Sequence, residues 1–542
     1  MNAHYLPAAE FTPAAGPAEH QAATAEAVKG AAVKGQAAEG QAAEGQAARR
    51  APVRWIALIA AVAFAAEMAV SARYGYVRDE LYFLEAGRHL AFGYVDQPPL
   101  TPLLARLSAA ASGDSLIALR LIPALALAGM VALTATMSRL LGAGRTGQVL
   151  AALATATCAE YVGAMHELTT AAPDFFFWTL TLVLVLKLLT TGDRRWWVAI
   201  GACVGVASEA KWNIGFLVAA LAVGFALTPA RRLAASWWLG LGALIAAGLA
   251  LPDLVWQAAN GWPAFDVFAV LQQSAGHNRA TYLIAQIIYT GLVLTPVWIA
   301  GLVWTLRNPA ARRFRSVGIA SLVVLALFLL MGGKPYYPGA IFTFLLAAGS
   351  VPLERWLAGR RPRARRLRPA AVMGCAMVVA TLISLPALLP VLPARALGTH
   401  PIIQKLNYDL GEEIAWPKLA GLVAREYHAL PPALRSRTTL LTSNYGEAGA
   451  IERFGPADGL PTAYSGSNNF WLWGPPPARD TAAIAVDMDP GFLRREFAHV
   501  RRIGTFENGL GVNDDEQGAP IYLATGLRSS WARAWPAFRN YG

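Results

Sequence analysis

The chain has 542 residues, of which 55% are hydrophobic and only 15% are charged. An average soluble domain is about one quarter charged, so this composition argues against an ordinary soluble protein. The formal net charge is +12, yet no nucleic acid is predicted as a partner, because that needs many exposed Lys and Arg side chains on a soluble surface. A basic, apolar chain with few charges is typical of a multi-pass membrane protein with cationic loops.

The first 50 residues contain short Ala-, Gly- and Gln-rich repeats such as AAEGQ. These repeats offer no large apolar face to bury, so residues 1–50 are predicted to be a disordered tail. The segment also lacks the basic start and short apolar core of a signal peptide. The first apolar run starts at Trp55 and is predicted to remain as a membrane anchor.

Residues 51–396 are predicted to form a mainly α-helical transmembrane domain. Crossing the hydrocarbon core takes about 20 mainly apolar residues in a helix. Eleven runs fit this length, at 54–72, 116–138, 147–164, 174–191, 195–209, 212–229, 234–254, 283–305, 315–332, 336–353 and 370–392. The fifth and sixth runs lie close together and could instead form one hairpin or a re-entrant pair.

The positive charge is concentrated in this apolar region, where 28 basic groups face 14 acidic ones. Alternate loops hold most of the surplus, with Arg54 at the start, pairs at Arg139/Arg145, Arg194/Arg195 and Arg231/Arg232, a group at 307–315 and a run at 355–368. Cytoplasmic loops of membrane proteins are enriched in Lys and Arg. The pattern therefore predicts a cytoplasmic N-terminus and, with eleven spans, an external C-terminus.

Residues 397–542 have an ordinary charge content and short β-like runs at 438–443, 482–487, 499–506 and 519–525. Helical patterns cover 414–429 and 444–454. Strands that alternate with helices indicate a small α/β domain, which the orientation places on the external face.

The external loops carry the residues that suggest chemistry. In the loop 73–115, Asp79 and Glu80 begin a helical pattern that runs through Arg88, and Asp96 precedes Pro98-Pro99, which end the helix and turn the chain. An amphipathic stretch over 100–110 follows. Asp79 and Glu80 could also be solvated loop charges.

Further ionisable residues lie at the same predicted membrane surface. These are His166, Glu167, Asp174, Lys211, and Lys334 with Tyr336 and Tyr337 in the segment GGKPYYPG. Ionisable groups at membrane depth are costly and suggest function. Two simpler readings remain open: Asp174 could cap its helix after Pro173, and Lys334 could extend to lipid head groups.

The segment RDELYFLEAGRHLAFGYVDQPPLTPLLARL resembles the first external loop of C-type glycosyltransferases that use polyprenyl-phosphate sugars. It is most similar to bacterial members of glycosyltransferase family 39, relatives of the protein O-mannosyltransferases and of the aminoarabinose transferases that modify lipid A. The shared features are Asp79-Glu80, Gly93-Tyr94 and Pro98-Pro99-Leu100, and more weakly Pro173-Asp174 and KPYYPG. The resemblance covers roughly residues 54–355.

The resemblance implies an inverting transfer of a hexose or pentose at the outer face of a bacterial cytoplasmic (inner) membrane. The sugar donor would be a polyprenyl-phosphate-linked sugar, and the acceptor a lipid, a glycan or a protein. Asp79 matches the family residue that acts as base, Glu80 would orient neighbouring groups, and Asp174 matches the second acidic position. The tail motifs SNYGEAGAIERFG and YSGSNNFWLWGPP resemble those of a bacterial subgroup with an external C-terminal domain.

The chemistry agrees with these roles. A sugar hydroxyl is a weak nucleophile, so a positioned carboxylate helps, and a departing phosphate needs cations or hydrogen-bond donors. Lys211 and Lys334 are the candidate cations, with Arg78 and Arg88 as alternatives. The remaining predicted substrate-binding residues are Tyr94, Asp96, His166, Glu167, Tyr336 and Tyr337. A divalent cation held by Asp79, Glu80 and Asp174 is a further possibility.

Two other classes of function compete with this prediction. A transporter or flippase of lipid-linked sugars would also bind such a ligand, but transporters place their binding groups near the bilayer midplane in two repeated halves. A scaffold or adhesion protein could use Trp471, Trp473 and Asn468-Asn469 to contact glycans. The simpler reading of these tryptophans is that they pack the tail onto the membrane domain or lie at the membrane interface.

Overall fold

The structure is a computed structural model that describes residues 51–359 and 369–541. The predicted disordered tail, residues 1–50, and most of the predicted basic run 355–368 lie outside the described residues. From Pro52 onward the chain forms one compact unit. The predicted boundary between residues 396 and 397 falls within this unit.

Helices occupy all eleven predicted spans. In the described part of the chain, seven helical segments are long and apolar enough to cross a membrane. They are Val53–Val70 (α2), Leu116–Leu140 (α5), Ala171–Thr191 (α8), Trp237–Ala259 (α12), Pro309–Met331 (η1, Pro309–Phe314, with α16, Arg315–Met331), Ile341–Ala358 (α17) and Pro369–Leu388 (α18). An eighth would be α14 (Ala275–Thr290) with α15 (Thr295–Arg307), which are bent by 105° at their junction.

The predicted count of eleven spans is not confirmed. The run 147–164 is divided into α6 (Arg145–Ala156) and α7 (Ala159–Ala164), and the fifth and sixth runs form α9 (Trp196–Ser208) and α10 (Ile214–Ala226). A helix of 13 residues such as α9 rises only about 20 Å, which is less than the hydrocarbon core of about 30 Å. Hydropathy alone does not reveal where a helix ends, so the predicted count of spans exceeds the number of helices long enough to cross a membrane.

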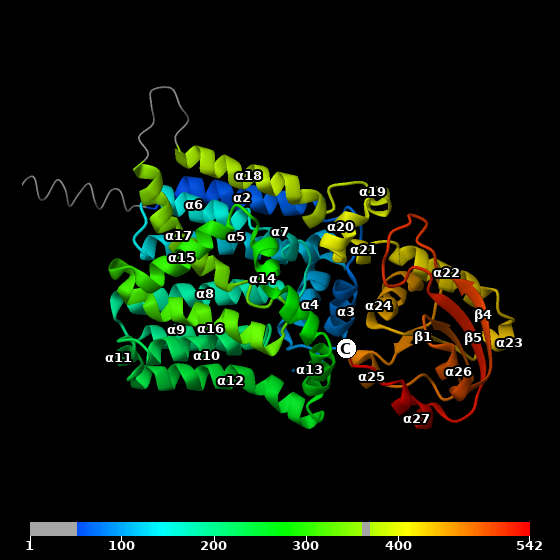
Figure 1. The fold of residues 1–542 in the computed structure, drawn as a ribbon. Coiled ribbons are helices and arrows are strands. Elements are labelled where there is room, and N and C mark those ends of the chain that lie inside the picture. The colour runs from blue at the N-terminus through cyan, green and yellow to red at the C-terminus, as the bar shows by residue number, and fades with distance from the viewer. Residues whose placement is uncertain (1–50, 360–368, 542) are drawn as a thin grey trace, which may run out of the picture. The chain divides into compact units, whose positions relative to one another are not determined.

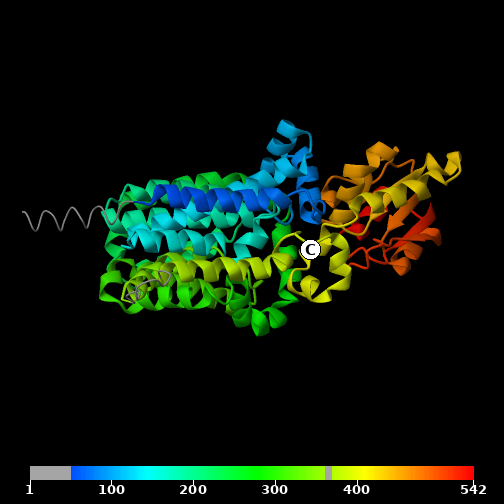
Figure 2. The same cartoon turned by 90° about the horizontal axis from the view of Figure 1, so that it is seen from above.

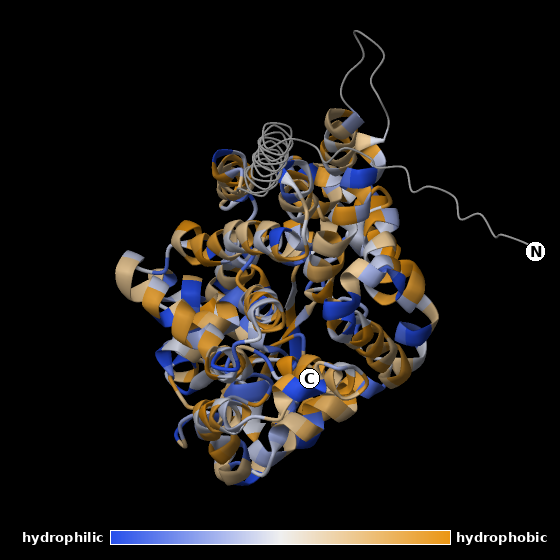
Figure 3. Cartoon of the chain, turned by 90° about the vertical axis from the view of Figure 1, so that its left-hand side faces the viewer, coloured by the Kyte–Doolittle hydropathy of each residue, from blue (hydrophilic) through white to orange (hydrophobic). Residues whose placement is uncertain are grey.

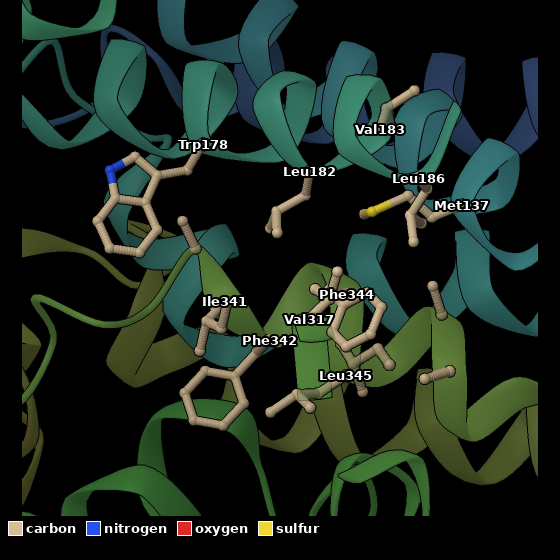
Figure 4. Packing of buried hydrophobic residues seen from close by; sticks show 14 of the residues in the cluster. Met137, Trp178, Leu182, Val183, Leu186, Val317, Ile341, Phe342, Phe344 and Leu345 are labelled. Atoms are coloured by element: carbon tan, nitrogen blue, oxygen red, sulfur yellow. The ribbon is translucent and has the colours of Figure 1, made fainter. Parts of the chain in front are cut away.

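The helices pack around an apolar core. Figure 4 shows Trp178, Leu182 and Leu186 of α8 facing Phe342 and Leu345 of α17. Apolar residues also cover the outside of the bundle, as Figure 3 shows by hydropathy. On α12 and α18, for example, Leu244 is 69% exposed and Ile383 is 75% exposed. An apolar exterior of this extent suits contact with membrane lipids.

The basic loops gather at one end of the helices. Arg194, between α8 and α9, donates a hydrogen bond of 3.0 Å to the backbone carbonyl of Arg232 in α11 (Arg231–Ala234). In Figure 1 this end lies away from the β-sheet. Basic loops that all lie on the cytoplasmic side of a membrane would gather in this way.

At the opposite end, the predicted helical stretches of the first loop form α3 (Arg78–Arg88) and α4 (Leu100–Ser112). Other helices follow at α13 (Pro263–Gln272), α19 (Ala394–Thr399), α20 (Pro401–Leu406), α21 (Asp409–Glu412), α22 (Trp416–His428), α23 (Pro432–Arg435) and α24 (Tyr445–Phe454). Figure 2 shows α3 and α4 beside the elements of the C-terminal part.

The C-terminal part contains a five-stranded sheet in the order β2-β1-β3-β5-β4. Four strands overlap the predicted runs: β1 (Thr438–Thr442), β3 (Ala482–Val486), β4 (Phe497–Thr505) and β5 (Pro520–Leu527). The sequence analysis missed β2 (Ala463–Ser465), which is only three residues long. β2 and β3 run parallel to β1, whereas β5 is antiparallel to β3 and β4. Short helices α25 (Asn468–Leu472), α26 (Pro490–Glu496) and α27 (Trp531–Ala534) complete this part.

The first loop and the C-terminal part share one hydrophobic core. Tyr82 and Phe83 of α3 belong to the same buried cluster as Val423 of α22, Ile451 of α24 and Ile484 of β3. Because α3 fills the core of the C-terminal part, the position of its first turn depends on the folding of both regions.

Candidate active site

Asp79 and Glu80 lie in the first turn of α3, but Glu80 is fully buried. Its two oxygens accept hydrogen bonds of 3.0 and 2.9 Å from the guanidinium of Arg120 in α5. Glu80 also accepts bonds from the backbone N–H groups of Val77 and Leu168. Glu80 is therefore held in an ion pair that fixes α3 against α5, a placement that agrees with an orienting role.

Arg120 is the centre of a buried polar group that we call the Arg120 network: Glu67, Glu80, Arg120, His166 and Glu413. The guanidinium also donates to Glu413 at 3.2 Å and to Nε2 of His166 at 2.8 Å. Nδ1 of His166 then carries the proton and lies 3.4 Å from Glu67. The sequence analysis missed Arg120, although a charge inside an apolar span is itself a signal.

Burial controls the charges of this network. It lowers the pKa of His166 well below its ordinary value, and the charge of Arg120 lowers it further. Burial raises the pKa of Glu413 to about 7, against the opposing effect of Arg120. Burial, followed by the charge of Asp409 and other acids, also raises the pKa of the adjacent Glu167. Burial thus favours the neutral forms of His166, Glu413 and Glu167, and the charge of Arg120 opposes this effect only at the two carboxyls.

Asp79 has different surroundings and keeps part of its surface accessible. The hydroxyl of Tyr445, in the first turn of α24, donates a hydrogen bond of 2.8 Å to its Oδ1. Charged and phenolic groups that interact electrostatically with Asp79 come from four separate parts of the chain: Arg78, Asp96, Lys211, Tyr336, Asp409 and Tyr445. We call these residues and Asp79 the Asp79 cluster.

Lys211 brings a cation to this cluster. It follows α9 and lies with its Nζ 4.8 Å from the ring centre of Tyr337 and 5.5 Å from that of Tyr336. Burial lowers the pKa of its ammonium group; Asp174 and Asp79 oppose this effect and Lys334 adds to it. The structure therefore brings the predicted residues of loops 209–213 and 332–340 together with Asp79. Lys334 itself is exposed.

Asp174, in the first turn of α8, is fully buried beside Lys211, Asn213 and Trp178. It interacts electrostatically with Lys211 and lies in the first turn of α8. Asp174 is joined to Asp79 through their common interaction with Lys211.

Asp96 links the first loop to the C-terminal part. Its oxygens accept hydrogen bonds from the Tyr82 hydroxyl at 2.9 Å and from the Asn468 amide at 3.2 Å. Asn469 in turn accepts a bond of 2.7 Å from the backbone N–H of Val95. Burial raises the pKa of Asp96 to about 7, which the hydrogen bonds from Tyr82 and Asn468 oppose.

The two asparagines and Trp473 thus hold the tail against the first loop, which agrees with the packing interpretation of the tail motifs. Trp473 stacks on His89 with 4.4 Å between ring centres, whereas the indole N–H of Trp471 donates to the Trp535 carbonyl inside the tail.

Three other predicted residues are engaged elsewhere. Arg78 is paired with Asp515 at 2.6 Å, and Arg88 with Asp114 at 2.8 Å. Arg88 ends α3, so it lies about 13 to 14 Å along the helix from Asp79. The hydroxyl of Tyr94 donates to the Ala86 carbonyl at 2.9 Å and holds the loop to α3. These contacts favour Lys211 and Lys334 as the cations of the site.

The C-terminal part supplies residues that the sequence analysis missed, namely Asp409, Glu413 and Tyr445. Although Asp409 keeps accessible surface, the surrounding protein raises the pKa of its carboxyl, and the charge of Asp79 adds to this. Sequence spacing gives no signal for these contacts, since more than 300 residues separate Tyr445 from Asp79.

The predicted metal ligands are not assembled. Within residues 51–359 and 369–541, no group of three or more His, Cys, Asp or Glu side chains is placed to hold a metal ion. Glu80 has both oxygens on Arg120, which removes it from a shared site with Asp79 and Asp174. A divalent cation stays a prediction from the sequence.

Comparison with known proteins identifies the fold. Residues 96–256 match the family model of dolichyl-phosphate-mannose-protein mannosyltransferases. No curated protein matches the chain in sequence. The crystal structure of ArnT from Cupriavidus metallidurans bound to undecaprenyl phosphate is similar with a TM-score of 0.55 and 17% identity, covering 87% of this chain and 98% of that chain. The chain has the fold of the C-type membrane glycosyltransferases.

Other solved structures agree with this C-type fold. The apo state of the same ArnT gives a TM-score of 0.54 at 16% identity, with 87% and 98% of the two chains covered. A mutant of the arabinofuranosyltransferase AftD from Mycobacteria gives 0.50 at 16% identity, covering 89% of this chain and 42% of that chain. The first 396 residues are only 73% of the chain (396 of 542). A coverage of 87% therefore takes in part of the C-terminal region as well.

Proposed function

We propose that the protein is an inverting glycosyltransferase that moves a sugar from a polyprenyl phosphate to an acceptor hydroxyl. The observation that carries this proposal is the Asp79 cluster, in which an accessible carboxylate lies in one electrostatic environment with Lys211 and two tyrosines. A base for the acceptor and a cation for the departing phosphate are the two groups that this reaction needs.

Asp79 acts as the base. Its carboxylate takes the proton of the acceptor hydroxyl as that oxygen forms a bond to the anomeric carbon of the sugar. The bond from this carbon to the phosphate oxygen breaks at the same time, and its electron pair leaves with the polyprenyl phosphate. Attack from the face opposite the phosphate inverts the configuration at the anomeric carbon. The oxocarbenium-like transition state gains stabilisation from nearby carboxylates.

Lys211 and Lys334 receive the departing phosphate, with Tyr336 or Tyr337 as hydrogen-bond donors. Burial lowers the pKa of Lys211, so a bound phosphate also helps to hold the ammonium group in its charged form. The exposed Lys334 makes a weaker contribution, because solvent screens its charge. The negative charge of Asp174 favours the charged form of the Lys211 ammonium group.

A lipid-linked sugar donor is supported by the fold neighbour ArnT, whose structure contains undecaprenyl phosphate. The apolar exterior of the bundle suits a donor whose chain stays in the membrane. The arrangement of basic loops at the other helix ends supports a reaction at the external face of a bacterial cytoplasmic membrane, with a cytoplasmic N-terminus. The acceptor is a lipid, a glycan or a protein.

Mass spectrometry of envelope glycolipids, glycans and glycoproteins tests the function. Cells with the wild-type chain should carry a hexose or pentose on one of these classes, and cells with Asp79→Asn should lose it at an unchanged protein level. Asp193→Asn, at an exposed site between α8 and α9, is the matched control. Retained transfer in Asp79→Asn would refute the base assignment. An unchanged glycan profile, with altered movement of a lipid-linked sugar between leaflets, would instead support a flippase.

A further inference from the structure

Tyr445 connects the C-terminal part of the chain directly to Asp79. Its hydroxyl lies 2.8 Å from Oδ1 of Asp79 and donates a hydrogen bond to it. We propose that Tyr445 is a positioning residue for Asp79, so that the C-terminal part completes the reaction site. This inference rests on the proposed role of Asp79 as the base.

The start of α24 is fixed by a capping box, which sets the position of Tyr445. The side chain of Asn444 accepts a hydrogen bond of 3.0 Å from the backbone N–H of Glu447. The Glu447 carboxylate accepts bonds from the N–H groups of Ser443 and Asn444 at 2.8 and 3.2 Å. These reciprocal bonds satisfy the free N–H groups of the first turn. Because β1 ends two residues before Asn444, the sheet and the cap together hold Tyr445.

Two glycines let α24 approach α3 closely enough for this contact. A Cβ atom at Gly446 would lie 2.8 Å from Cβ of Arg78, and one at Gly449 would lie 2.9 Å from Cβ of Leu81. A larger residue would push the helices apart and move Tyr445 away from Asp79. The motif SNYGEAGAIERFG therefore combines a cap, a tyrosine and two glycines that serve the same contact.

Neighbouring rings hold the phenol in its orientation. The ring centre of Tyr445 lies 4.8 Å from that of Tyr82, and the guanidinium of Arg78 lies 5.9 Å from the Tyr445 ring. Burial, followed by the charge of Asp79, raises the pKa of Tyr445 well above its ordinary value. The hydroxyl therefore keeps its proton and acts as the donor to the carboxylate.

The hydrogen bond to Oδ1 restricts the rotation of the Asp79 carboxylate and so holds the base in one orientation. The other groups facing Asp79, namely Arg78, Asp96, Lys211, Tyr336 and Asp409, come from α3, the first loop, the α9–α10 and α16–α17 connections, and α21. Removing the Tyr445 hydroxyl leaves these groups in place. The effect of its hydrogen bond on Asp79 can therefore be measured apart from theirs.

The test is Tyr445→Phe in the full-length protein, which keeps the ring and removes the donor. Steady-state sugar transfer gives kcat and the KM of the lipid-linked donor separately. We expect kcat to fall by roughly tenfold or more in Tyr445→Phe, because a hydrogen bond to a charged group changes an equilibrium constant by about that factor. The KM should stay unchanged, because the substitution removes no group assigned to the donor phosphate.

Tyr427→Phe is the control, because the Tyr427 hydroxyl bonds to the Arg435 carbonyl within the tail. It should leave both kcat and the KM unchanged. An unchanged kcat in Tyr445→Phe, at an unchanged melting temperature, would overturn the proposal. Absent transfer in the wild type would refute the proposed function, whereas transfer in the wild type with an unchanged kcat in Tyr445→Phe would refute only the positioning role of Tyr445.

Discussion

Asp79 and Glu80 are neighbours in the sequence, yet they belong to two regions with opposite properties. Glu80 is fully buried in the Arg120 network, where both of its oxygens are paired. Asp79 keeps accessible surface and lies among groups from four parts of the chain in the Asp79 cluster. Successive residues of a helix point about 100° apart, so one turn of α3 serves both regions.

Within this dipeptide, Glu80 therefore has a structural role, and Asp79 has the proposed chemical role. The Arg120 network ties α2, α5 and the loop before α8 to Glu413 of the C-terminal part. It fixes the direction in which Asp79 leaves the helix. The Asp79 cluster then presents a carboxylate and a cation to a substrate. Damage to the first region should therefore appear in stability, and damage to the second in activity.

The largest effect is expected from Arg120→Met, which leaves Glu80 buried and unpaired. Removing one partner of a buried ion pair costs about 3–5 kcal/mol, so little folded protein should remain in detergent extracts, as measured by its melting temperature. Arg425→Met is the control. The Arg425 side chain is 71% exposed in its ion pair with Glu426, and exposed pairs contribute less than about 1 kcal/mol. Equal losses in both variants would contradict the central place of Arg120.

The comparison is sharpest in the pair Asp79→Asn and Glu80→Gln, which make the same chemical change at adjacent residues. Asp79→Asn should lower sugar transfer by about 10²- to 10⁴-fold, the usual range for a general base, while the melting temperature stays constant. Glu80→Gln should lower the melting temperature, because Arg120 loses its charged partner. Measuring transfer and melting for both variants checks this reciprocal pattern. The reverse result would exchange the two roles.

A pH dependence of stability is expected from Asp96. Burial raises its pKa from 3.8 to about 7, so between about pH 4 and pH 7 the folded state keeps a proton that the unfolded chain releases. Folding is therefore disfavoured as the pH rises through this window. The raised pKa corresponds to at most about 4 kcal/mol of stability lost across this window. Asp96→Asn lacks the titrating group, so its melting temperature should fall less than that of the wild type over the same pH range. An identical slope in wild type and variant would contradict this assignment.

The smallest effects distinguish the two lysines. Lys211→Met should raise the KM for the lipid-linked sugar about tenfold or more, because its charge is half-buried and poorly screened. Lys334→Met should change the KM only about two- to threefold, because Lys334 is exposed and solvent screens its charge. Steady-state kinetics at low and high salt checks both expectations. A larger effect at Lys334 would place the phosphate nearer the exposed lysine.

The sequence predicted the helical runs, four strands of the C-terminal sheet and the acidic pair of the first loop, because hydropathy and periodicity are local properties. It left open whether the runs at 195–209 and 212–229 cross the membrane or form a hairpin or a re-entrant pair, and each forms a helix of 13 residues. It also missed Arg120, Asp409, Glu413 and Tyr445. Each of these residues gains its role from partners on distant segments, which local patterns do not record.

The sequence by itself determined that the chain is apolar, that its basic loops alternate and that the first loop carries the features of C-type glycosyltransferases. Only the tertiary structure decided which carboxylate of the pair is buried and that the tail reaches Asp79 through Tyr445. The physical reason is that burial and pairing depend on the three-dimensional surroundings. Here the Glu80–Arg120 ion pair ties α3 to α5, whereas α24 packs against α3 and brings Tyr445 to Asp79.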